Sequence, residues 1–232
     1  MIDGGSGRQI LRALGHTLPF YDHEIDLVIA THPDADHIGG LPFVLDRYQV
    51  LGVMDNGQTE AGDDFILFDQ KAKKETRARL SARAGQTIDL GAGAVLEIIF
   101  PERDMQGLET NRASIVARLV YGETEFLLTG DAPLEIESYL IGKYGSALKA
   151  DVLKLGHHGS HTSSSAYFLS AVKPQYAVIS AGQDNRYGHP HQDVLARLKE
   201  MKIPFVSTAI QGTIEFVSDG HNIACKKCVS VL

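Results

Sequence analysis

Long apolar runs are absent from this sequence of 232 residues. Charged residues or glycines interrupt every hydrophobic stretch within about ten residues, well short of the roughly 20 that a helix needs to span a bilayer. The first residues also lack the basic and then apolar pattern of a secretory leader. The sequence therefore predicts no membrane segment and shows no sign of secretion.

An excess of basic residues is also absent, because the formal net charge is −7. This charge argues against a protein that wraps nucleic acid on a broad basic surface, since phosphate contacts need clustered Lys and Arg. It does not exclude a nuclease, because bound metal ions supply positive charge where the chemistry occurs. The basic run from Lys71 to Arg83 favours a solvated helix face over a phosphate-binding surface.

Cysteine is scarce, and its two copies form one C-x-x-C motif at Cys225 and Cys228. There is no second cysteine pair to complete a zinc site and no βαβ context for a redox site. The motif therefore favours two ordinary thiols, with a redox or zinc role as the weaker alternative.

The hydrophobic content of 44% and charged content of 22% are typical of a globular protein, and the length predicts one domain over residues 1–232. Short β-rich runs alternate with amphipathic stretches, which predicts an α/β fold. The expected strands are 27–30, 50–54, 95–100, 114–120, 125–129, 152–155, 176–180, 205–207 and 212–217. The expected helices are 39–48, 63–81, 133–144, 164–171 and 192–201.

The most informative segment follows the first expected strand and places four metal-binding side chains within six positions. Carboxylate and imidazole groups are ligands of zinc and manganese, and their density here favours two adjacent ions over an accidental polar loop. The four residues are His32, Asp34, Asp36 and His37.

Two further clusters also follow expected strands, where open α/β sheets place their sites. Asp131 comes after a glycine that permits a tight turn, which favours a bridging carboxylate over a plain turn residue. His157 and His158 lie between glycines, and two consecutive side chains cannot easily face one ion. We therefore expect one to bind metal and the other to face substrate or solvent.

The last cluster follows the expected strand 176–180 and contains Asn185, Tyr187 and His189. His189 is a candidate for holding a substrate oxygen, with a loop that caps the next helix as the alternative. The expected substrate-binding residues are Ser160, Asn185, Tyr187 and His189, and the expected catalytic residues are Asp36, His157 and His189.

Together these segments resemble the metallo-β-lactamase superfamily. The first cluster is similar to the H-x-D-x-D-H motif of that superfamily, and Gly130-Asp131 and Gly156-His157-His158-Gly159-Ser160 resemble its later motifs. With the segment from Asn185 to His191, the chain is similar more narrowly to the metallo-hydrolase domain of ComEC-type DNA-internalisation competence proteins. This resemblance implies a four-layer αβ/βα sandwich with a dinuclear metal site at one edge.

Two departures from the family pattern stand out. The chain opens at Met1-Ile2-Asp3, which predicts a sandwich that lacks its first N-terminal strand or strands. No histidine lies between His37 and His157, so one ion is expected to have fewer protein ligands. Asp3 is expected either to orient a ligand histidine or to shape a turn.

The resemblance implies two divalent ions, zinc or manganese, held by six residues. A hydroxide between the ions would attack phosphorus, with His157 or His189 protonating the leaving oxygen or holding the phosphate. One ion is expected on Asp36, His37, His158 and Asp131, and the other on His32, Asp34 and Asp131.

These expectations favour a metal-dependent phosphodiesterase, a nuclease with DNA as substrate, and the family resemblance implies a link to DNA uptake. One alternative is a hydrolase of small esters, such as phosphorylcholine esters, lactones or β-lactams, because the same hydroxide attacks carbonyl carbon. Another is a metal-binding module without turnover. The family resemblance implies an extracytoplasmic location, with a cytoplasmic one as the alternative, while oligomeric state stays open.

Overall fold

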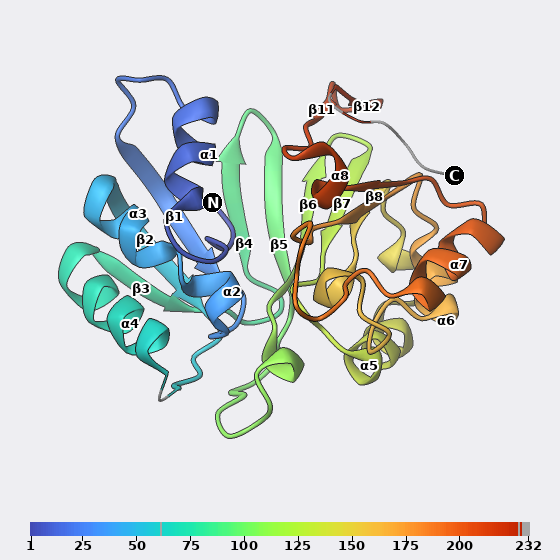
Figure 1. Ribbon diagram of the computed structural model, residues 1–232, viewed down its shortest axis with the longest axis horizontal. Coiled ribbons are helices and arrows are strands. Elements are labelled where there is room, and N and C mark those ends of the chain that lie inside the picture. Colours follow the sequence, from blue (N-terminus) through green and yellow to red (C-terminus); the bar gives the residue numbers. More distant parts are fainter. Residues whose placement is uncertain (61, 227, 229–232) are drawn as a thin grey trace. The chain divides into compact units, whose positions relative to one another are not determined.

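The computed structural model describes residues 1–60, 62–226 and 228. The chain divides into two compact units, each made of two separate segments (Figure 1). The N-terminal unit contains Met1–Ala84 and Phe100–Ile115, and the C-terminal unit contains Gly85–Ile99 and Val116–Leu232. The single domain expected over 1–232 stays a prediction, and the two units are described separately below.

The N-terminal unit is built on a parallel sheet in the order β1-β2-β3. The end of β1 is apolar and buried on consecutive residues, which is typical of a parallel strand covered on both faces. The strands are β1 (Glu24–Ala30), β2 (Gln49–Asp55) and β3 (Ala78–Ser81). The helical segments are α1 (Gln9–Thr17), α2 (Ala35–Ile38), α3 (Leu41–Arg47), α4 (Asp63–Glu75) and the 3₁₀ turn η1 (Asn111–Ala113).

The core of this unit forms where α3 and α4 pack beside the sheet. Val28 and Val53 from the strands meet Leu41 and Val44 of α3 and Phe68 of α4, and all five side chains are buried. Each such burial contributes about 1.5–3 kcal/mol to the free energy of unfolding. This packing holds the end of β1, where the first metal-binding cluster begins.

The second segment of the N-terminal unit is tied to its sheet by backbone hydrogen bonds. The Ile115 N–H donates to the Thr31 carbonyl at 2.9 Å, and Asn56 Nδ2 donates to the Ala113 carbonyl at 3.1 Å. These bonds explain why residues 100–115 belong to this unit although a hairpin of the other unit precedes them.

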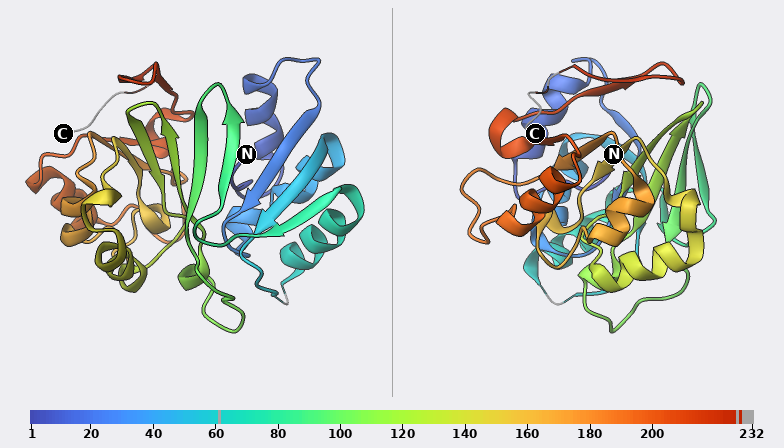
Figure 2. Two further views of the ribbon diagram at one scale, coloured as in Figure 1. Left: turned by 180° about the vertical axis from the view of Figure 1, so that it is seen from behind. Right: turned by 90° about the vertical axis from the view of Figure 1, so that its right-hand side faces the viewer.

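The C-terminal unit contains a mixed seven-stranded sheet in the order β10-β9-β8-β7-β6-β5-β4. Strands β7 to β10 are parallel, while β4–β5 and β6–β7 are antiparallel hairpins that lie side by side (Figure 2). The strands are β4 (Thr87–Gly91), β5 (Ala94–Phe100), β6 (Val116–Tyr121), β7 (Thr124–Leu128), β8 (Val152–Lys154), β9 (Tyr176–Ile179) and β10 (Phe205–Ser207).

Buried side chains of α5, α6 and α7 supply much of the core of this unit. Two side-chain oxygens accept backbone hydrogen bonds at the start of α6. Ser165 Oγ accepts from the Phe168 N–H at 3.1 Å, and the Glu137 carboxylate accepts from the Ser165 N–H at 2.9 Å. The helical segments are α5 (Leu134–Tyr144), η2 (Gly145–Leu148), η3 (Gly156–Gly159), α6 (Ala166–Val172), α7 (Gln192–Glu200) and α8 (Thr208–Gln211).

A small hairpin, β11 (Phe216–Ser218) with β12 (Ile223–Cys225), ends the described part of the C-terminal unit. The expectation of two ordinary thiols is wrong, because Cys225 and Cys228 form a disulfide. Their Cα atoms lie 5.7 Å apart, within the range that a disulfide spans. Among the described residues, no helix is long and apolar enough to cross a membrane.

The predicted helix 63–81 is wrong in its last part, because α4 ends at Glu75 and residues 78–81 form β3. The Arg77 N–H donates to the Leu51 carbonyl at 3.1 Å, and Arg79 Nε donates to Asp55 Oδ2 at 2.8 Å. Pairing of residues 78–81 with β2 thus outweighs the helical pattern of the sequence. Arg79 therefore lies in a strand and not on the solvated helix face that the charge pattern predicted. The sequence also did not predict α1, α2, α8, β4 or β12.

We expect Gly40→Ala to destabilise the N-terminal unit, because a Cβ there would collide with the Gly4 carbonyl oxygen. The loss should be about 1–3 kcal/mol of unfolding free energy, measured by thermal or denaturant unfolding. Gly142→Ala in α5 is the matched control, since open space surrounds its added methyl group. The control should be neutral or stabilising by up to about 1 kcal/mol, and equal destabilisation by both variants would contradict the steric argument.

Candidate metal centre

The first cluster lies in the turn between β1 and α2. Asp34 is extended at the N-terminal end of α2, so the chain reverses within a few residues and returns His37 beside His32. Both histidines are buried, with ring centroids 4.0 Å apart, whereas Asp36 is exposed and Asp34 is intermediate. The N-terminal unit therefore brings the four predicted ligands into one short turn.

Both buried histidines are held at Nδ1, which leaves Nε2 to act as a ligand atom. Thr31 Oγ1 donates to Asp3, so its lone pairs can accept from His32 Nδ1 at 3.1 Å. His37 Nδ1 lies 2.7 Å from Asp3 Oδ2. A carboxylate or hydroxyl behind a histidine fixes the tautomer in which Nε2 carries a lone pair.

His32 Nε2 is a buried nitrogen with no hydrogen-bond partner in the part of the chain that the structure describes. Asp34 Oδ2 lies 3.7 Å from it, too far for a hydrogen bond. Burial tends to raise the pKa of Asp34, but the His32 ring and the Thr110 hydroxyl outweigh it and lower that pKa. A buried nitrogen without a hydrogen-bond partner lowers the stability of the fold, so His32 Nε2 is suited to bind a metal ion.

Asp3 connects the N-terminus to this turn. Its carboxylate accepts from the Thr31 N–H at 2.8 Å and from Thr31 Oγ1 at 2.8 Å, in addition to its contact with His37. Burial acts to raise the pKa of Asp3, but His37, His32 and the Thr31 N–H lower it overall. The contact with a motif histidine that the sequence suggested is thus present, and Asp3 adopts a left-handed backbone at φ 52° to make it.

Asp131 lies in the C-terminal unit, just after β7. Gly130 has φ 52°, a left-handed conformation that lets the chain turn and bury the following carboxylate. His158 Nε2 lies 3.3 Å from Asp131 Oδ2, and His157 Nε2 lies 3.9 Å from the same oxygen. This unit therefore gathers the predicted bridging carboxylate and both histidines of the second cluster.

The two consecutive histidines have strained backbones, with φ 46° at His157 and φ 54° at His158. Left-handed conformations of this kind cost about 1–3 kcal/mol each and concentrate at functional sites. His158 Nδ1 contacts the Ser180 carbonyl at 2.6 Å, and His157 Nδ1 contacts Thr162 Oγ1 at 3.0 Å. Each ring again presents Nε2 toward Asp131.

Ser160, a predicted substrate-binding residue, is buried beneath this loop. Its hydroxyl accepts from Thr162 Oγ1 at 3.0 Å, and Thr162 in turn contacts His157. In this structure Ser160 therefore helps to orient His157, and substrate binding by Ser160 stays a prediction.

Lys154 is a site residue that the sequence reasoning missed. Its Nζ donates to the Gly130 carbonyl at 2.9 Å and to the Leu155 carbonyl at 3.2 Å, and lies 3.9 Å from Asp131 Oδ1. Its positive charge beside Asp131 offsets part of the negative charge of the cluster. The available signal was a single lysine at the end of β8, between apolar residues 152–153 and 155.

His189 lies on a loop that is held by Asn185. Asn185 Nδ2 donates to the His189 carbonyl at 2.6 Å, and Asn185 Oδ1 accepts from the His189 N–H at 2.8 Å. The His189 ring lies 5.3 Å from that of His157, between centroids. Burial, followed by the rings of His157, His191 and His158, lowers the pKa of His189 to about 4, so its ring is neutral near pH 7.

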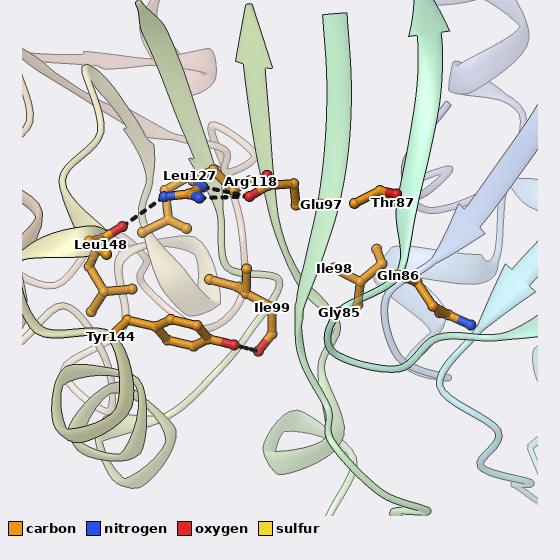
Figure 3. A pocket seen from close by; sticks show the side chains of 11 residues that line it. Gly85, Gln86, Thr87, Glu97, Ile98, Ile99, Arg118, Leu127, Tyr144 and Leu148 are labelled. Carbon is orange, nitrogen blue, oxygen red and sulfur yellow. Dashed lines mark hydrogen bonds and ion pairs between the residues drawn. The ribbon is translucent and has the colours of Figure 1, made fainter.

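A separate hollow of about 270 Å³ in the C-terminal unit contains none of the predicted site residues (Figure 3). Its polar groups satisfy one another: Arg118 Nη2 lies 2.7 Å from Glu97 Oε2, and Arg118 Nη1 donates to the Ala147 carbonyl at 2.8 Å. The Tyr144 hydroxyl donates to the Ile99 carbonyl at 2.8 Å (Figure 3). This hollow is therefore not the candidate site.

Comparison with protein families matches residues 2–183 to the metallo-beta-lactamase superfamily model, which covers most of the chain. The chain belongs to the metallo-β-lactamase superfamily. The metallo-β-lactamase fold expected from the motifs is thereby confirmed. Metal-dependent hydrolysis is the class of chemistry that this membership supports, and the His and Asp clusters in both units agree with it.

Within the superfamily, the chain is similar to competence proteins. It is 35% identical over 192 residues to competence protein ComA of Neisseria gonorrhoeae, covering 83% of this chain and 25% of that protein. It is 34% identical over 195 residues to ComE operon protein 3 of Bacillus subtilis, covering 83% of this chain and 24% of that protein. The chain thus spans about a quarter of the length of these relatives.

A solved structure shows the same fold at low sequence identity. Zn²⁺-bound PqqB from Methylobacterium extorquens superposes with a TM-score of 0.50 at 14% identity, covering 89% of this chain and 78% of that chain. This likeness supports the metallo-β-lactamase fold and nothing about the substrate.

We expect Asn185→Ala to release the loop that carries His189, because the His189 N–H loses its side-chain acceptor. Native-state hydrogen exchange should show at least about tenfold faster exchange of the His189 amide, which corresponds to about 1.4 kcal/mol of local opening. Gln183→Ala, at an exposed position of the same loop, is the control. Unchanged exchange in Asn185→Ala would show that other contacts hold the loop.

Proposed function

We propose that this chain is a metal-dependent phosphodiesterase that cleaves DNA, with two divalent ions of zinc or manganese as cofactors. The buried His32 Nε2 that lacks a hydrogen-bond partner among the described residues is the observation that carries the proposal. The proposed metal ligands are His32, Asp34, Asp36 and His37 of the N-terminal unit, and Asp131 and His158 of the C-terminal unit.

The donor set fits such ions in its chemistry. Three imidazoles and three carboxylates form a mixed nitrogen and oxygen set that suits zinc and also the harder manganese ion. Three carboxylates with charge −3 leave two divalent ions with a net charge of about +1. A bound hydroxide would make this charge nearly zero, so the site would accept an anionic phosphodiester without strong repulsion.

When bound, the ions supply Lewis acidity to the phosphoryl oxygens and lower the pKa of a water nucleophile. His157 would donate a proton from Nε2 to the leaving oxygen when its ring is doubly protonated, since Thr162 holds its Nδ1 and its Nε2 points to the cluster around Asp131. His189, neutral and held by Asn185, binds a phosphate oxygen through its ring. Asp36, the exposed carboxylate of the motif, completes the predicted catalytic set as a metal ligand.

The relatives support DNA as the substrate. One of them is named as a competence protein, and a third relative, recombination protein 2 of Haemophilus influenzae, is 31% identical over 200 residues. The predicted substrate-binding residues Ser160, Asn185 and Tyr187 all belong to the C-terminal unit, and of the three Tyr187 is the exposed one that would contact DNA directly.

The direct test is cleavage of labelled single-stranded and double-stranded DNA with added Mn²⁺ or Zn²⁺. Wild-type protein should cleave DNA only with metal, and Asp131→Ala should lower the rate at least about 100-fold because a carboxylate ligand is lost. Asp193→Ala, at an exposed aspartate of α7, is the matched control and should keep full activity.

Metal content measured on each protein makes the result decisive. Intact DNA after incubation with metal-loaded wild-type protein would overturn the nuclease assignment. Hydrolysis of phosphorylcholine esters, lactones or β-lactams by the same sample would then identify a small-ester hydrolase, and no turnover of any substrate would identify a binding module.

We also expect Asp3→Asn to weaken metal binding, because the amide cannot hold His37 in the tautomer that a charged carboxylate favours. Loss of such a supporting contact typically weakens metal affinity by about 10–100-fold, which competition with a chromogenic chelator measures. Asp63→Asn, an exposed aspartate at the start of α4, is the control. Equal affinity of the Asp3 variant and the wild type would show that Asp3 only shapes the turn.

A further inference from the structure

Three rings of the C-terminal unit form a column of nearly parallel planes. The His158 and His189 rings are 6.2 Å apart between centroids with an interplanar angle of 21°. The Tyr187 ring continues the column at 5.7 Å from His189 with an angle of 22°. The column thus runs outward from a proposed metal ligand to a tyrosine on the loop.

The outer end of the column is exposed and carries positive charge. Tyr187 keeps 56% of its surface accessible. The Arg186 guanidinium lies over the Tyr187 ring, with Cζ 4.8 Å from the centroid, and Nη2 donates to the Tyr187 hydroxyl at 2.6 Å. These contacts hold both flat groups together at the surface.

The loop that presents this pair is anchored. Asn185 bonds to the backbone of Gly182 and His189 at either end of the segment that contains Arg186 and Tyr187. A tyrosine has few rotatable bonds, so its ring binds a flat ligand at a low cost in conformational entropy. The arrangement is therefore suited to a planar ligand that also carries negative charge.

We propose that Arg186 and Tyr187 form a stacking site for an unpaired nucleobase of the DNA strand whose phosphate is bound near His189. This inference rests on the proposed function and makes the substrate single-stranded. Flat aromatic and guanidinium groups bind single-stranded nucleic acid by stacking, with little dependence on base identity. A base inside a duplex already stacks on both neighbours and cannot use this site without leaving the helix.

The test measures binding of the full chain in EDTA, so that no cleavage interferes. The probes are a fluorescein-labelled oligothymidylate, an abasic oligonucleotide of equal length, and a duplex of that length, at low salt to retain the phosphate contacts. Tyr187→Ala should weaken oligothymidylate binding by about 5- to 150-fold, the loss of one base stack, and should leave abasic binding unchanged.

Three variants separate stacking from other effects. Tyr187→Phe keeps the ring and should bind within about twofold of wild type, which also checks folding. Arg186→Lys keeps the charge but loses the plane, so it should weaken oligothymidylate binding more than abasic binding. Tyr167→Ala, at a tyrosine of α6 that is 83% exposed, is the matched control and should bind as wild type does.

The proposal is overturned if Tyr187→Ala binds oligothymidylate as wild type does, if it loses affinity equally for the abasic probe, or if wild type binds both probes equally. The stacking proposal and the proposed phosphodiesterase function can fail independently of each other. Metal-dependent cleavage with no role for Tyr187 removes only the stacking site. A Tyr187-dependent preference for bases without any cleavage removes only the hydrolytic assignment.

Discussion

The anchoring of each histidine at Nδ1 is the constraint on which the candidate centre depends. His32 is held by the Thr31 hydroxyl, His37 by Asp3 and His158 by the Ser180 carbonyl. A histidine that donates from Nδ1 keeps its lone pair on Nε2, so the three rings have the tautomer that the proposed metal ligands need. Preorganisation of this kind lowers the entropy cost of binding, and it explains why so much buried hydrogen bonding surrounds these turns.

The backbone carbonyl of Gly130 links the two motifs of the C-terminal unit. It accepts from Lys154 Nζ at 2.9 Å and from the His157 N–H at 3.3 Å. The glycine turn that aims Asp131 and the strained turn that aims His157 are thus held by one acceptor. Because the lysine also stands 3.9 Å from Asp131, it combines a structural bond with electrostatic compensation of a buried carboxylate.

The site motifs could be predicted from sequence because dense metal-binding residues directly after strands are rare by chance. Lys154 could not, since an isolated lysine in a strand usually reaches solvent, and only the fold shows that it returns to Gly130. The helix predicted through Ser81 failed for a similar reason, because pairing of Arg77 with Leu51 joins residues far apart in sequence. The role of Asn185 in holding the His189 loop could not be predicted either, since an amide side chain in a loop can bind a ligand as well as hold the backbone.

The interleaving of the two units along the chain has a consequence for folding. Residues 85–99 belong to the C-terminal unit, yet residues 100–115 return to the N-terminal unit and bond to Thr31 and Asn56. During synthesis the first unit cannot be completed until the first hairpin of the second has already emerged from the ribosome. No single cut in the chain separates the two units, so neither unit can be removed as one continuous segment.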